Sequence, residues 1–374
     1  MLFYSYMTSA KEGFIIHPTL KDLGYPATEQ RVHVESWHGQ ELTDNYAWLE
    51  GDGSGVKGWE AAQNQLTRRY LDSLDYRADI KDSLKKWFDL DQIGTPFPRG
   101  DKMFQWKRKA GENHYVLYVG QGLDDQEAVI DPNTMSKDGT TAIDWTSITR
   151  DGKYLTYGVS EGGSEQSVLR IRDVDTKKEL PDVIPYTRHS SISWLPDKSG
   201  FYYTRLPEPG TVPAGEEHYD RKVFFHKLVS DWPEDKLIFA PKDPHDDHPA
   251  IILSQDGQWA KLSVSHGWNS NDVYVAKAGG DPTSPDFKPL AVGENNHFYV
   301  TEFNGFFYIM TDHEAPKYKI MRVSCDTPDL SNKSKWEEFI PEQESTLDDF
   351  RIIGGKAVLG YQVKACSRLE LMDL

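Results

Sequence analysis

The sequence predicts a mainly β protein built from repeated units of about 50 residues and preceded by an amino-terminal helical segment. Two patterns lead to this prediction. Apolar residues recur at helical spacing between residues 54 and 90, and beyond Pro96 and Pro98 they alternate with a period of two. Tight glycine turns then return at intervals of 48 to 57 residues. With 38% hydrophobic and 12% aromatic residues among 374, the chain can bury a large core.

The helical segment divides into two amphipathic helices. In the first, apolar residues three or four positions apart share one face, and we expect Asp75 to cap the second helix. These helices belong to an amino-terminal segment, residues 1–92, and the β repeats occupy residues 93–374. The predicted apolar faces comprise Val56, Trp59, Ala62, Leu66, Tyr70 and Leu74 in the first helix, and Ile80, Leu84, Trp87 and Phe88 in the second.

Each repeat begins with an alternating strand, makes a glycine turn and continues into further strands. The clearest repeat runs from Trp145 to Val174, with its turn at Asp151-Gly152. Glycine suits these turns because it adopts positive φ without steric cost. The six turns are Gly100-Asp101, Asp151-Gly152, Asp197 to Gly200, Asp256-Gly257, Asn304-Gly305 and Gly354-Gly355.

A period of about 50 residues with this strand content favours four-stranded sheets arranged radially, as in a β-propeller. Each sheet has two apolar faces that only its neighbours can cover. The sixth repeat starts at Asp348, and the chain reaches Leu374 within it. We therefore expect about six blades, the last one incomplete.

The charge balance narrows the possible partners. The net charge is −17, which disfavours nucleic acid and anionic membranes as partners. The two cysteines, Cys325 and Cys366, are too few for a disulfide scaffold or a structural zinc site. The opening segment Met1–Met7 lacks the features of a signal peptide, and no apolar run has the length of a membrane helix. These features predict a soluble, cytoplasmic protein.

No motif identifies a catalytic, cofactor-binding or metal-binding residue, so we predict none. A nucleophile elbow requires Gly-x-Ser-x-Gly, which the sequence lacks. His245-Asp-Asp-His248 is the best metal candidate, but a solvated loop explains it better. Gly53 to Gly58 has the spacing of a dinucleotide-binding loop without the flanking strands. Ser254 to Trp259 is an imperfect sialidase-type box that occurs once.

The amino-terminal segment resembles that of the prolyl oligopeptidase family. The matching residues include a Tyr-Pro opening at Tyr25-Pro26 and an Asp-x-Tyr-x-Trp-Leu-Glu run within Thr43 to Glu50. Two departures are Asn45 in place of a proline and Gly51 in place of an acid. Further matching segments are Arg31, His38-Gly39, Trp59, Ala62 to Asn64, Gly200 to Arg205, Lys222 to Leu228 and Thr311 to Pro316.

This resemblance implies a seven-bladed propeller that covers an α/β-hydrolase domain with a Ser-Asp-His triad. Such enzymes cleave short peptides after proline, and the propeller restricts which peptides reach the triad. The helices of residues 1–92 would then pack on the hydrolase domain, and Tyr25, Tyr46, Trp48 and Trp59 would make structural contacts. Because the triad follows the propeller, it would lie beyond this chain, so no catalytic residue is carried over.

We therefore expect the substrate-gating part of a proline-specific serine peptidase, inactive alone. Its expected partners are short peptide substrates and the carboxy-terminal hydrolase domain, within a full-length form that is a monomer. Two alternatives stay open: a stand-alone propeller that serves as a protein interaction module, and a propeller hydrolase with an unrecognised site.

Overall fold

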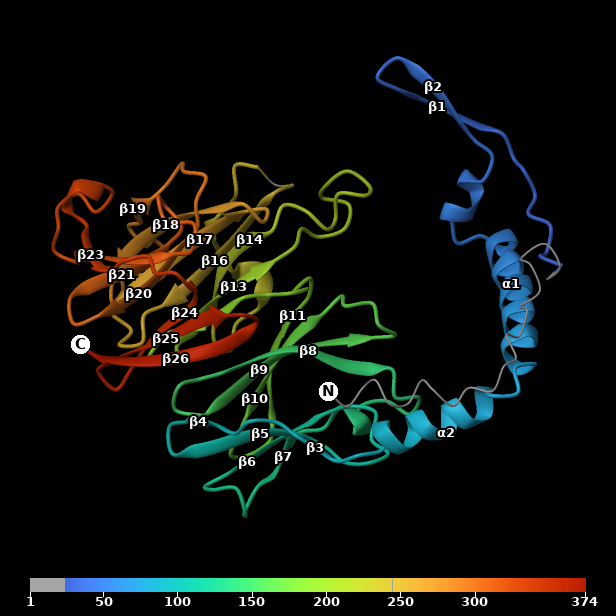
Figure 1. The fold of residues 1–374 in the computed structure, drawn as a ribbon, viewed down its shortest axis with the longest axis horizontal. Coiled ribbons are helices and arrows are strands. Elements are labelled where there is room, and N and C mark those ends of the chain that lie inside the picture. Colours follow the sequence, from blue (N-terminus) through green and yellow to red (C-terminus); the bar gives the residue numbers. More distant parts are fainter. Residues whose placement is uncertain (1–23, 244) are drawn as a thin grey trace. The chain divides into compact units, whose positions relative to one another are not determined.

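The structure is a computed structural model that describes residues 24–243 and 245–374 (Figure 1). The opening segment Met1–Met7 lies outside the described residues. The chain divides into two compact units, Met1–Leu90 and Asp91–Leu374. Within the described ranges, no helix combines the length and the apolar character needed to cross a membrane.

The first unit contains a β-hairpin that was not predicted from the sequence pattern. Strands β1 (His33–Trp37) and β2 (Gln40–Asp44) pair in antiparallel register. The two turn residues, His38 and Gly39, have φ values of 51° and 79°. Positive φ at both positions is typical of a two-residue turn whose twist matches that of the strands. A short 3-10 helix, η2 (Ala47–Glu50), follows the hairpin.

Both predicted helices are present, as α1 (Ser54–Asp72) and α2 (Arg77–Phe88). Leu66 on the predicted face of α1 is buried, and Trp59 on that face is half-buried. The expectation that Asp75 caps the second helix is wrong. The chain forms a turn in which the Arg77 amide donates to the Leu74 carbonyl, so the N-cap position falls on Tyr76, whose side chain makes no capping hydrogen bond.

The second unit consists of six antiparallel sheets that follow one another in sequence order, as the colours of Figure 1 show. In the first sheet β3 and β4 both pair with β5, so together they occupy one strand position, interrupted at Gly94 to Pro96. The sheets contain β3 (Gln92–Ile93), β4 (Phe97–Arg99), β5 (Lys102–Arg108), β6 (Val116–Gly120) and β7 (Glu127–Ile130); β8 (Thr141–Ile148), β9 (Tyr154–Glu161), β10 (Val168–Asp173) and β11 (Glu179–Ile184); and β12 (Ile192–Trp194), β13 (Gly200–Arg205), β14 (Lys222–Lys227) and β15 (Lys236–Phe239).

The fourth to sixth sheets have the same layout, except that the sixth has three strands. Short 3-10 helices lie in three of the connections. The elements are β16 (Asp247–Leu253), β17 (Trp259–His266), β18 (Ser270–Lys277) and β19 (Lys288–Ala291); β20 (Phe298–Phe303), β21 (Phe306–Thr311), β22 (Lys319–Ser324) and β23 (Glu337–Ile340); β24 (Thr346–Ile353), β25 (Lys356–Val363) and β26 (Cys366–Asp373); and η3 (Pro132–Thr134), η4 (Trp232–Glu234) and η5 (Lys333–Lys335).

All six predicted glycine turns join the first strand of a sheet to its second strand, which confirms the repeat. Gly152 and Gly257, for example, have φ values of 73° and 74°. The third sheet differs, because Lys198 carries the positive φ and Gly200 begins β13. Gly200 is required for another reason: a Cβ there would lie 2.3 Å from the His226 carbonyl oxygen.

Five hydrophobic cores hold the six sheets together, one between each pair of consecutive sheets. The core between the second and third sheets, for example, contains Ile171, Phe201 and Tyr203. Tyr202, the neighbour of the last two, packs with Phe225 in the next core. Alternate residues of a strand therefore serve different cores. This succession of sheet-to-sheet cores is that of six consecutive blades of a β-propeller, the sixth with three strands.

Candidate functional site

The first strands of four sheets surround a common cavity of about 620 Å³. Its lining comes from sheets one to four, although these segments lie up to about 150 residues apart in the sequence. First strands that meet around one space form the inner wall of a propeller channel. The lining segments are Pro98 to Gly100, Ser147 to Arg150, Ile192 to Trp194, Ile252 to Leu253 and Gln255.

Arg150 bridges two sheets at this end of the channel. It lies in the turn after β8, and its guanidinium donates hydrogen bonds to the carbonyl oxygens of Leu253 at 3.3 Å, Ser254 at 2.5 Å and Gln255. Burial lowers the pKa of Arg150, but an arginine remains charged near pH 7. Arg150, although exposed to solvent in part, thus ties the second sheet to the fourth, across the third.

Neighbouring turns interlock at the same end. A Cβ at Gly100 would lie 2.7 Å from the Asp151 carbonyl oxygen, and one at Gly257 would lie 2.4 Å from Cγ of Pro196. Lys198 forms a 2.8 Å ion pair with Asp151. Burial alone would raise the pKa of Asp151, but Lys198 and Thr149 lower it to about 2. This end of the channel is therefore closely packed.

We expect Arg150→Ala to lower the free energy of unfolding by about 2 kcal/mol, because it removes charged hydrogen bonds to three carbonyl groups. Urea unfolding followed by tryptophan fluorescence measures the change. Arg351→Ala is the matched control: Arg351 forms an exposed ion pair with Asp349, whose loss should cost under about 1 kcal/mol. Equal losses for the two variants would contradict the bridging role of Arg150.

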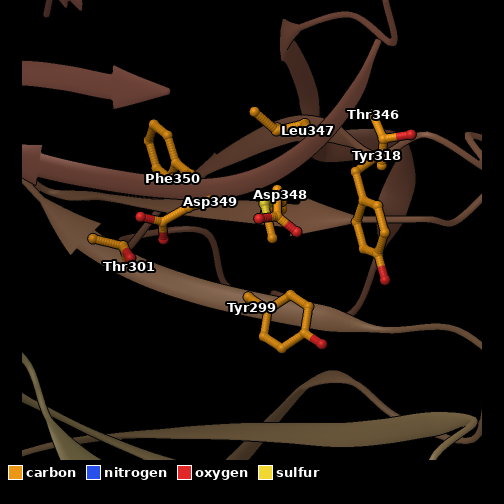
Figure 2. A pocket seen from close by; sticks show the side chains of 9 residues that line it. Tyr299, Thr301, Tyr318, Thr346, Leu347, Asp348, Asp349 and Phe350 are labelled. Atoms are coloured by element: carbon orange, nitrogen blue, oxygen red, sulfur yellow. The ribbon is translucent and has the colours of Figure 1, made fainter. Parts of the chain in front are cut away.

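A second cavity, of about 360 Å³, lies between the first strands of the fifth and sixth sheets (Figure 2). One wall is β24, where the pairing with β25 shifts between Leu347 and Asp349. This β-bulge adds one residue, Asp348, and a bulge of this kind redirects side chains. Both Asp348 and Asp349 are exposed. The other lining residues are Tyr299, Thr301, Met310, Tyr318, Thr346, Leu347 and Phe350.

Several imidazole groups pair with carboxylates. The most buried is His226, whose Nε2 lies 2.9 Å from Asp182 and whose Nδ1 lies 2.7 Å from Asp235. Tyr203 donates to the other oxygen of Asp235 at 2.7 Å. Burial lowers the pKa of His226, but the two carboxylates outweigh it and raise the pKa to about 9. His226 is therefore a buried cation near pH 7.

This buried group differs from a hydrolytic triad, because both imidazole nitrogens of His226 face carboxylates and none is free to accept a proton from a nucleophile. Among residues 24–243 and 245–374, no serine hydroxyl forms a hydrogen bond with an imidazole. The described residues thus show no nucleophile and base arranged for acyl transfer.

The metal alternative at His245 and His248 finds no support. His245 pairs with Glu216 at 2.9 Å and its ring packs at a tilt against that of Tyr219, whereas Asp247 accepts a hydrogen bond from the imidazole of His266 at 2.5 Å. In the part of the chain that the structure describes, no three His, Cys, Asp or Glu side chains are placed to hold a metal ion.

The remaining motifs have structural roles. Ser254 and Asp256 form a side-chain hydrogen bond that supports the turn between β16 and β17. Gly53 is the N-cap residue of α1. In the first unit, the indole of Trp48 donates to the Glu29 carbonyl and that of Trp59 to the Thr28 hydroxyl, each at 2.9 Å.

Neither Arg150 nor Asp348 was predicted from the sequence as a site residue. Arg150 directly precedes the predicted turn Asp151-Gly152. Because the equivalent turns of all the repeats lie at one end of the channel, an alignment of the repeats would have placed Arg150 there. The pair Asp348-Asp349 interrupts the alternation of Leu347 and Phe350 with one extra residue. That break in a period of two is the signal for a bulge.

The fold and the channel define a β-propeller. Comparison with known families gives a match over residues 25–374 to "Prolyl oligopeptidase, N-terminal beta-propeller domain". The chain belongs to this family. The resemblance in the amino-terminal segment and the repeats is thereby confirmed.

Similar proteins include the prolyl endopeptidase of Elizabethkingia meningoseptica, 28% identical over 357 residues, with 94% of this chain and 49% of the relative covered. Prolyl oligopeptidase A of Amanita bisporigera is 26% identical, with 85% and 46% covered. A structure from a study of two prolyl endopeptidases has a TM-score of 0.86 at 29% identity, with 94% and 51% covered. The chain spans about half the length of the curated relatives it matches.

Proposed function

We propose that the chain is the substrate-gating part of a prolyl-oligopeptidase-like serine peptidase that cleaves short peptides after proline. The family match over residues 25–374 carries the proposal. The cavity of about 620 Å³ that the first strands of four sheets surround supports it, because a space of this size can hold an extended short peptide and excludes folded proteins. In this role the propeller binds and filters, and the bond-breaking groups lie on another domain.

The proposed partner of the first unit is that catalytic hydrolase domain, on which the helices of residues 1–92 would pack. The apolar face of α2 supports this proposal. Ile80 and Leu84 are exposed, and the side chain of Trp87 is 74% exposed. An apolar helix face of this kind is typical of a surface that another element covers.

The two free cysteines are consistent with a reducing, cytoplasmic location. Cys325 is buried and Cys366 is exposed, and the two are not joined in a disulfide. Burial raises the pKa of the Cys325 thiol to about 12, which keeps it protonated and unreactive. We propose that the full-length form is a cytoplasmic monomer.

The purified 374-residue chain should not hydrolyse a chromogenic Gly-Pro substrate, because the described residues hold no nucleophile and base within reach of each other. Release of the chromophore at micromolar protein measures this. A full-length prolyl endopeptidase serves as the positive control. Sustained turnover that a serine-directed inhibitor abolishes would contradict the proposal and favour a hydrolytic site within the propeller.

A further inference from the structure

We propose that the cavity between the fifth and sixth sheets binds the cationic group of a peptide, so that peptides with an arginine or lysine near the proline are preferred ligands. This inference rests on the proposed peptide-gating function and names the substrate class. It depends on three features of the cavity: an unpaired carboxylate, two aromatic rings and the lack of a competing cation.

The unpaired carboxylate is that of Asp348. It forms no hydrogen bond or ion pair with any residue that the structure describes, whereas the adjacent Asp349 is neutralised by Arg351 at 3.0 Å. Figure 2 shows Asp348 between Asp349 and Tyr318, with the ring of Tyr299 across the cavity. A peptide cation at this point would meet a free negative charge.

A second bulge in the molecule shows what an equivalent aspartate does when its carboxylate is occupied. Strand β8 has a bulge at the corresponding point of the second sheet, where Asp144 is the extra residue. Asp144 accepts hydrogen bonds from Ser160 at 2.9 Å and Ser167 at 2.5 Å. The sixth sheet keeps the bulge but leaves Asp348 without such donors. Its carboxylate is thus available to a ligand.

The aromatic wall consists of Tyr299 and Tyr318, whose ring centroids lie 6.4 Å apart. Tyr299 is 51% exposed, and its ring also stacks with that of His297, with centroids 6.1 Å apart. Cations are attracted to the faces of aromatic rings, and a guanidinium can also pair with a carboxylate in a planar, two-bonded geometry. A ring and a carboxylate at one cavity therefore suit arginine best.

One cation, Arg351, contacts a lining residue, but it pairs with Asp349 and not with Asp348. Among the nine described residues that line it, none is lysine, arginine or histidine. Lys317, next to Tyr318, is held at the Glu344 carbonyl oxygen at 2.5 Å. The chain as a whole carries a net charge of −17, which also attracts cationic peptides. Local and overall charge thus favour the same ligand.

The test compares two peptides, acetyl-Gly-Arg-Gly-Pro-amide and its citrulline counterpart, which differ by one charge at nearly constant shape. Isothermal titration calorimetry with the 374-residue chain should show roughly five- to tenfold tighter binding of the arginine peptide, the effect of one exposed ion pair and one cation–π contact. Asp348→Asn should bring the ratio close to one. Tyr299→Leu should lower it by roughly two- to fivefold.

Asp124→Asn is the matched control, because it removes one charge from an exposed loop of the first sheet and should leave the ratio unchanged. Thermal unfolding verifies that each variant folds.

Equal binding of the two peptides, or a ratio that Asp348→Asn does not change, would overturn the inference and leave the gating function in place. A third ligand, acetyl-arginine-amide, tests whether the cavity binds a cation without any contribution from the rest of a peptide. If it binds in an Asp348-dependent manner while added glycine and proline residues contribute nothing, the cavity inference holds and the peptide-gating function fails.

Discussion

His226→Leu should lower the free energy of unfolding by about 3–5 kcal/mol, which is the largest effect that we expect from a single substitution. The substitution removes the cation between two buried carboxylates, Asp182 and Asp235, and leaves their charges uncompensated. One oxygen of Asp182 lacks a hydrogen-bond partner, and the other accepts from the Val229 amide at 2.6 Å as well as facing His226, so loss of the imidazole would leave this buried carboxylate with one neutral donor. Urea unfolding with detection by tryptophan fluorescence measures the loss.

Two further variants test the electrostatic origin of this loss. His297→Leu breaks an imidazole–carboxylate pair with Asp312 in which both side chains still reach solvent, with 25% and 24% of their surface exposed, and should cost under about 1 kcal/mol. Adding Asp182→Asn to His226→Leu should recover part of the loss, because one buried charge is then gone. If the double variant were no more stable than His226→Leu, lost packing would explain the effect and buried charge would not.

The free energy of unfolding should also fall as the pH rises from about 6.5 to about 9. Burial disfavours the charged His226, but Asp182 and Asp235 together raise its pKa to about 9, against 6.5 in the unfolded chain. The folded state therefore binds this proton more tightly. The stabilisation is complete below pH 6.5 and is lost as the pH passes through 9, a total of about 3 kcal/mol.

Urea midpoints at half-unit steps of pH measure this decline, and the range from 6.5 to 8 is the most informative. Above pH 8 a second group acts in the opposite direction, since burial lowers the pKa of Lys261 to about 8. His266 adds to the decline, because its carboxylate partners also raise its pKa. NMR titration of the imidazole ring protons shows which histidine causes the decline, and the resonance of His226 should titrate above pH 8. A midpoint that is constant from pH 6.5 to 8 would refute a charged His226.

The repeat was predictable because turns and alternation are local properties. A glycine at Gly152 or Gly257 reports the backbone conformation of its own turn, and the spacing of such turns gives the number of sheets. The two helices were predictable for the same reason, from the faces that contain Leu66 and Trp87. The start of the second helix was misplaced because Asp75 is a good capping residue by type, yet it lies inside the turn that the Arg77 amide closes on the Leu74 carbonyl, one residue before the N-cap position.

The site residues were not predictable in the same way, because each depends on segments far apart in the chain. Arg150 meets Ser254 only when the third sheet brings the second and fourth together. His226 gains its charge from Asp182, 44 positions earlier, and an isolated histidine in a strand gives no sign of that partner. The family resemblance supplied the fold and the expected function, but it named none of these contacts.

The succession of sheet-to-sheet cores determines how the effects of two substitutions on the free energy of unfolding combine. Tyr202 and Tyr203 are consecutive residues, yet their rings pack in different hydrophobic cores. The losses of unfolding free energy from substitutions at these two adjacent positions should therefore add almost independently. Ile171 and Tyr203 are remote in sequence but pack in the same core, so substitutions there should show strong energetic coupling. Distance along the chain is thus a poor guide to which substitutions compensate one another in this protein.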